Sequence, residues 1–171
     1  MSKYSFQVLT FTPSAIADAT NLTTGTFMAI QGGTSTQAID IWSVSLQGQA
    51  TASNTNLMLL ARDSTVGASL TALASPNTNA LLPAEATAPT TGPSAFIAAT
   101  TLPQRSNATT SPKKPFVFNS FGGSAYWHAY DRSECFSIFG NTASLGECSL
   151  SGFTGTGTTG PCAGEIIYEV E

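Results

Sequence analysis

The feature that most constrains the fold is a series of short apolar and β-branched runs separated by turn residues. Each run is four to nine residues long, and helix-period patterns are nearly absent from the 171 residues. Runs of this length are typical of strands in a sandwich or barrel. We expect an all-β fold, a two-sheet antiparallel sandwich of jelly-roll-like form. The expected strands cover 4–11, 26–30, 39–47, 56–61, 96–100, 115–119, 125–130, 135–139, 146–150 and 163–170.

The chain length fits one β-sandwich domain over residues 1–171. Residues 64–115 differ from the rest, because they hold seven of the nine prolines among Ala, Thr, Ser and Asn. Proline repeatedly interrupts strand pairing. We therefore expect this segment to be an extended arm or long loop that drapes over the sandwich or reaches a neighbouring subunit, with one short helix at 66–73.

Charged residues make up 9% of the chain, against about 25% in a typical soluble domain. Catalysis at neutral pH needs several titratable groups in one pocket, and this chain has one histidine. The sequence therefore predicts a structural or binding protein rather than an enzyme. No pattern predicts a cofactor: phosphate-binding and dinucleotide-binding glycine motifs are missing.

Six basic residues and a net charge of −4 give no footprint for nucleic acid, since the basic residues are dispersed except for Lys113 and Lys114. No apolar stretch approaches the roughly 18 residues that span a bilayer. We therefore expect neither a nucleic acid nor a membrane as partner.

Three cysteines, Cys135, Cys148 and Cys162, lie far apart in the last third of the chain. An odd number does not fit a fully paired disulfide framework, so free thiols are expected. A bridge between Cys148 and Cys162 is one alternative. A zinc site that combines the thiols with His128 is a weaker one, because no pair of cysteines has zinc-knuckle spacing.

Aromatic residues alternate between Tyr126 and Tyr130, with Trp127 on the opposite face of the expected strand. Tyr126, Trp127 and Tyr130 are candidate contacts for a glycan or a protein partner, since flat aromatic faces stack on sugar rings. They could equally belong to the sandwich core. His128 and Asp131 could form a proton-transfer pair, but a strand histidine among aromatic neighbours explains the pattern better.

Arg62 and Asp63 stand where one expected strand ends. An Arg followed by Asp at a strand exit favours a local ion pair and a turn, which would support the corner. The alternative is that Arg62 contacts an anion or a partner.

Four stretches carry a resemblance to a known group of proteins. They are LARDSTVG at 60–67, FNSFGG at 118–123 followed by Trp127, GECSLSGFTG at 146–155, and IIYE at 166–169. Their order and spacing resemble small all-β virion proteins of tailed bacteriophages that decorate or cement the capsid exterior. The chain differs from these proteins before Trp127, where Tyr126 stands in place of an arginine.

The resemblance implies a non-enzymatic capsid decoration protein, made in the host cytoplasm and located in the virion. Its implied partners are copies of itself, in a trimer or other homo-oligomer, and the major capsid protein or another virion protein. A chain with few charges suits such contacts, because many copies can meet without charge repulsion. The alternatives are a subunit of a tail tube or filament, and a glycan-binding module of a head fibre or tail.

Overall fold

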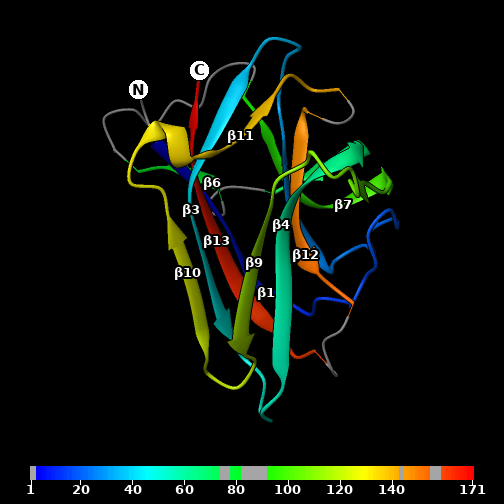
Figure 1. The fold of residues 1–171 in the computed structure, drawn as a ribbon, viewed down its shortest axis with the longest axis vertical. Helices are drawn as coiled ribbons and strands as arrows, with labels where there is room; N and C mark the ends of the chain where they lie inside the picture. Colours follow the sequence, from blue (N-terminus) through cyan, green and yellow to red (C-terminus); the bar gives the residue numbers. More distant parts are fainter. Residues whose placement is uncertain (1–2, 74–77, 82–91, 143–144, 155–158) are drawn as a thin grey trace.

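The computed structural model describes residues 3–73, 78–81, 92–142, 145–154 and 159–171. It contains two antiparallel β-sheets packed face to face (Figure 1). The strands are β1 (Lys3–Phe11), β2 (Phe27–Gln31), β3 (Ala38–Gly48), β4 (Thr55–Thr65), β5 (Ala68–Ala72), β6 (Thr78–Ala80), β7 (Ser94–Thr101), β8 (Gln104–Arg105), β9 (Lys113–Asn119), β10 (Ser124–His128), β11 (Phe136–Phe139), β12 (Glu147–Gly152) and β13 (Cys162–Val170).

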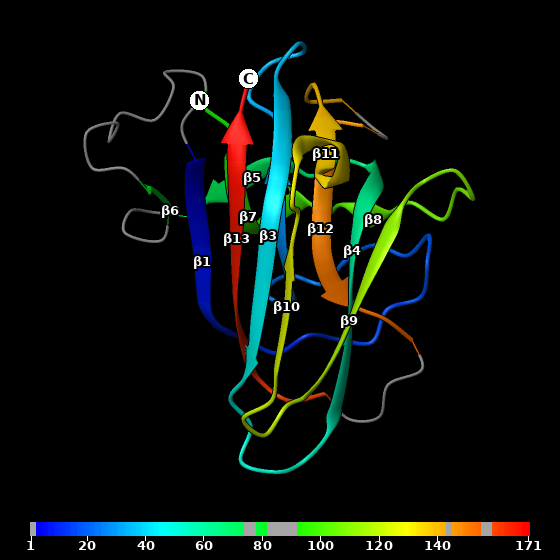
Figure 2. The ribbon, with the colours of Figure 1, turned by 60° about the vertical axis from the view of Figure 1, so that its left-hand side comes forward.

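One sheet has the order β10-β3-β13-β1-β6, and β11 also pairs with β3. The other has the order β5-β7-β2-β12-β4-β8, and β9 also pairs with β4. Figure 2 shows β1, β13, β3 and β10 side by side, with β9 next to β10. A short 3₁₀ turn, η2 (Arg132–Glu134), lies between β10 and β11, which pair with successive parts of β3.

Eight of the strands pair in a nested order. β1 pairs with β13, β2 with β12, β3 with β10, and β4 with β9. The outermost partners are the first and last strands, and each later pair lies inside the one before it. This nesting is the topology of a double-sheet jelly roll. The expected all-β, jelly-roll-like sandwich is therefore confirmed.

The main core lies between the two sheets and follows the period-2 alternation of the strands. In β13, Ile166 and Tyr168 face this core, and in β3 the side chains of Ile41, Val44 and Leu46 do so. Gly164 lies where a Cβ would come within 2.4 Å of the Met28 sulfur, so a larger residue would force the Met28 side chain to move.

A second, smaller core covers the far side of the seven-stranded sheet. Phe27, Ala29 and Phe96 of that sheet pack against Ile16 and Leu22 from the segment between β1 and β2. The segment therefore closes a face that would otherwise be open to water.

All ten strands expected from the sequence are present. Their ends differ from the expected ones by at most two residues, except that β4 runs four residues further. The helix expected at 66–73 is wrong, because β5 occupies Ala68–Ala72 and pairs with β7. The described part of 64–115 is not an arm either: it contributes β5, β7, β8 and β9 to the seven-stranded sheet and β6 to the other. Residues 74–77 and 82–91 of that segment lie outside the described residues.

All three cysteines are free thiols, so the expected bridge-free state is confirmed and the alternative bridge is wrong. Cys148 and Cys162 are buried in the main core, and burial raises the pKa of Cys162 to about 12. They therefore act as small hydrophobic residues.

Candidate binding surface

Four strands present a broad outer face, on the side of the six-stranded sheet opposite the core. Lys3 and Glu169 lie toward one end of it. Toward the other end, the outward side chains include those of Gln7 and Leu9 on β1, Ala163 and Glu165 on β13, Ser45 and Gln47 on β3, and Tyr126 and His128 on β10. We call these eight residues the β1–β10 face. A shallow depression of about 220 Å³ lies in it, over β1, β3 and β13.

The β1–β10 face has little charge. Glu165 is the single carboxylate among its eight residues, and its Oε1 accepts a hydrogen bond from Gln7 Nε2 at 2.9 Å. Leu9 and Tyr126, at opposite sides of the face, are 67% and 68% exposed. Leu9 and Tyr126 are thus exposed to water on these strands, while the carboxylate of Glu165 is already hydrogen-bonded.

Two of the three candidate aromatic residues are open to solvent. Tyr126 stands beside His128 with the rings nearly parallel, at an interplanar angle of 6° and a centroid distance of 6.4 Å. Tyr130 follows β10 and is 89% exposed. Asp131 does not bond to His128 in the described structure: its Oδ1 accepts from Ser133, and these hydrogen bonds lower the pKa of Asp131.

The third aromatic residue, Trp127, points the other way. It is half-buried against the main core, and Lys114 Nζ lies 4.0 Å from the centroid of its ring. This cation–π contact links β10 to β9 across the edge of the sandwich. The structure therefore separates Trp127, which packs inside, from Tyr126 and Tyr130, which remain free to meet a ligand.

Replacing Tyr126 and Trp127 with alanine should give unequal effects on stability. We expect Trp127→Ala to lower the free energy of unfolding by about 2–3 kcal/mol, because it removes buried ring surface and the Lys114 contact. Tyr126→Ala should change it by less than about 0.5 kcal/mol. Urea unfolding of the two variants measures the difference, and equal losses would contradict this division of roles.

Arg62 and Asp63 do not form the turn expected from the sequence. β4 continues to Thr65 because its end pairs with β8, so both residues lie within a strand and point to opposite faces. Arg62 crosses to the other sheet, where its Nε and Nη2 donate to the carbonyl oxygen of Ser137 at 3.0 and 2.6 Å. Asp63 is wholly buried on the far side.

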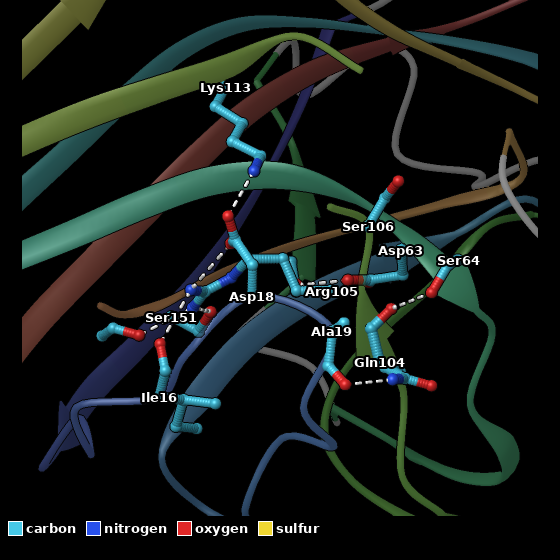
Figure 3. A network of polar contacts seen from close by, with 12 residues as sticks. Ile16, Asp18, Ala19, Asp63, Ser64, Gln104, Arg105, Ser106, Lys113 and Ser151 are labelled. Carbon is cyan, nitrogen blue, oxygen red and sulfur yellow. Dashed lines mark hydrogen bonds and ion pairs between the residues drawn. The ribbon is translucent and has the colours of Figure 1, made fainter. Parts of the chain in front are cut away.

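A buried polar network surrounds Arg105, which is fully buried (Figure 3). Its guanidinium donates to the carbonyl oxygens of Ile16 at 3.1 Å and Gly152 at 2.6 Å, and to the hydroxyl of Ser151. Asp18 lies between Arg105, at 3.7 Å, and Lys113. Arg105 thereby holds the segment between β1 and β2 against the end of β12.

Two buried carboxyl groups, those of Asp63 and Glu147, lie on the seven-stranded sheet. Glu147 Oε2 accepts from Gln31 Nε2 at 3.0 Å and from the backbone N–H of Gly67 at 2.9 Å, and Asp63 Oδ1 accepts from the Ser149 hydroxyl at 2.7 Å. The two carboxyl groups also repel each other, and Asp63 Oδ2 and Glu147 Oε1 accept no hydrogen bond from the described residues.

Both members of this pair have raised pKa values. Burial raises the pKa of Glu147 to about 7, while its donors oppose the shift. Burial, and then repulsion from Glu147, raise the pKa of Asp63 well above its ordinary range. The pair therefore holds a proton near neutral pH. Sequence analysis missed Arg105 and Glu147, because their burial depends on segments distant in the chain.

Comparisons with known proteins give no assignment. No family model and no curated protein matches this chain. Within the described ranges, no helix is long and apolar enough to cross a bilayer, and no cluster of three or more His, Cys, Asp or Glu side chains is arranged to hold a metal ion.

Proposed function

We propose that this chain is a non-enzymatic structural protein of a bacteriophage virion, and specifically a capsid decoration protein that stabilises the assembled shell. The observation that carries the proposal is the β1–β10 face. Its eight residues include one carboxylate, that of Glu165, and Leu9 and Tyr126 are exposed on it. Such a face can pack against another protein without desolvating free ions.

Two further observations support the proposal. The nested strand order is that of the double-sheet jelly roll, an architecture that viral capsid proteins use among others. The sequence stretches that resemble decoration proteins also lie on the sandwich itself, in β4, β9, β12 and β13. Because one fold hosts many functions, the jelly roll alone assigns no role, and the exposed β1–β10 face is the stronger support.

The proposed mechanism is linkage. A protein that binds the assembled shell, and not its free subunits, shifts the equilibrium toward the shell. Copies of the chain would meet through the β1–β10 face, as a trimer or other homo-oligomer, while the rest of the surface remains for the major capsid protein. Glu165, held by Gln7, leaves little like-charge repulsion when two such faces meet.

A charge placed on this face should block self-association. We expect the wild-type chain to sediment as a homo-oligomer, and Leu9→Glu to weaken its association by about tenfold or more, because like charges would then face each other. Val117→Glu is the matched control, since Val117 is 63% exposed but belongs to β9 in the other sheet.

Analytical ultracentrifugation over a range of concentrations measures both effects. A monomeric wild-type chain, or equal weakening by the two substitutions, would contradict the proposed face.

Binding of a glycan is the second candidate function, and the exposure of Tyr126 and Tyr130 favours it. Exposed aromatic rings beside hydroxyl and amide groups suit sugar recognition, and lectin domains also use jelly rolls. Trp127 would take no part, since it faces the core. In this case a glycan array would give signals that Tyr126→Ala abolishes.

A further inference from the structure

A second concave site lies at the open edge of the sandwich, away from the β1–β10 face. It is a cleft of about 190 Å³ between the start of β9 and the η2–β11 segment. Arg62, Lys113 and Lys114 line it together with Phe136 and a single acid, Glu134. Three of the six basic residues of an acidic protein thus converge on one cleft, although Arg62 lies far from Lys113 and Lys114 in the sequence.

Two of these cations have no carboxylate partner in the described part of the chain. Arg62 donates to the neutral carbonyl of Ser137 and lies over the Phe136 ring at 5.6 Å. Lys114 lies over the Trp127 ring. Lys113, by contrast, is paired with Asp18. The positive charges of Arg62 and Lys114 therefore remain available to an anion.

The acid in the cleft does not neutralise them by contact. Glu134 Oε2 accepts the backbone N–H of Tyr130 at 3.0 Å, and no ion pair joins it to Arg62 or Lys114 among the described residues. Both cations are also held in place. Arg62 contacts the Ser137 carbonyl and the Phe136 ring, and Lys114 contacts the Trp127 ring. Held cations lose little side-chain entropy when a ligand binds.

We propose that this cleft binds a carboxylate side chain from an acidic peptide segment of a partner protein. Arg62 and Lys114 would bind the carboxylate, and Phe136 would contact its aliphatic part. The cleft is smaller than the roughly 300–1,000 Å³ of small-molecule pockets, so a single side chain suits it better than a free metabolite.

The first residues of β9 favour recognition of the partner through a side chain rather than through addition of a strand to the sheet. β9 begins with Lys113, Lys114 and Pro115. Proline removes a backbone donor, and lysines guard a sheet edge against pairing. Binding of an acidic peptide here does not depend on the proposed virion role, because the cleft lies on a different surface from the β1–β10 face.

Isothermal titration calorimetry tests the proposal by comparing the affinities of a capped tetraglutamate peptide and its tetraglutamine counterpart. We expect tetraglutamate alone to bind, and Lys114→Met to weaken it roughly tenfold, as loss of one charge-assisted contact implies. Lys114→Arg should keep the affinity, because it keeps the charge.

The matched control is Lys3→Met. Lys3 Nζ also lies over a tryptophan ring, that of Trp42, at 3.5 Å, but outside the cleft. Unchanged affinity in this control supports the assignment. Equal binding of the two peptides, equal loss in Lys3→Met and Lys114→Met, or binding of inorganic phosphate with no binding of tetraglutamate would overturn it.

Discussion

Replacing Arg105 with methionine is expected to lower the free energy of unfolding by about 3–5 kcal/mol, the cost of breaking a buried charged network. Methionine keeps much of the side-chain volume, so the loss reports on polar contacts rather than on a cavity. Three acceptors that Arg105 satisfies, on Ile16, Ser151 and Gly152, would lose their donor. The carboxylate of Asp18 would keep only Lys113.

The matched control is Arg132→Met. Arg132 also pairs with two carboxylates, Asp40 and Glu171, but its side chain is 53% exposed. Water reaches the Arg132 guanidinium and screens its ion pairs, so this variant should lose much less stability than Arg105→Met. Urea unfolding at pH 7 gives both values. Ser151→Ala, which removes one acceptor of Arg105, keeps the comparison measurable if Arg105→Met does not fold. Equal losses for Arg105→Met and Arg132→Met would contradict the role of Arg105.

The protein should become less stable as the pH rises from about 5 to 8. The folded state holds a proton on the Asp63–Glu147 pair at pH values where an unfolded carboxyl group has lost it. Since the folded state then binds more protons, its stability falls with rising pH. For Glu147 the loss begins above the ordinary value of 4.5 and is complete near pH 7; Asp63 extends it upward.

Glu147→Gln tests this dependence directly. An amide at this position can still accept from Gln31 and the Gly67 N–H, and it can donate to Asp63 without a shared proton. We expect the variant to match the wild type near pH 5 and to exceed its stability at pH 8, by an amount on the order of 1–3 kcal/mol. Glu165→Gln, on the β1–β10 face, should leave the pH profile unchanged.

Urea midpoints measured at pH 5, 6, 7 and 8 give the profile for each variant. Two outcomes would contradict the proton held by the Asp63–Glu147 pair. One is a wild-type stability that does not change with pH, and the other is a Glu147→Gln variant less stable than the wild type at pH 8.

The strands of the jelly roll could be predicted because their side chains alternate locally. In β13, Ile166 and Tyr168 face the core while Glu165 and Ile167 face outward, and the sequence shows this period of two. β5 shows no such pattern: none of its five residues is buried, so nothing local marked it as a strand. β6 and β8, of three and two residues, are too short to form a pattern.

The polar sites could not be predicted for a related reason. Arg62 and Asp63 look like a strand exit, yet pairing of β4 with β8, some forty residues away, extends the strand through them. Glu147 is buried because Gln31 and Gly67 fold over it. The aromatic alternation did predict that Trp127 and Tyr126 face opposite ways, but not which of the two faces water.

Cryo-electron microscopy of particles purified from the native source of this protein tests the proposed decoration role most directly. We predict density for the jelly roll on the outer surface of the capsid shell, with the β1–β10 faces of neighbouring copies in contact. Density confined to a tail tube or fibre, or none on any particle, would contradict the decoration role.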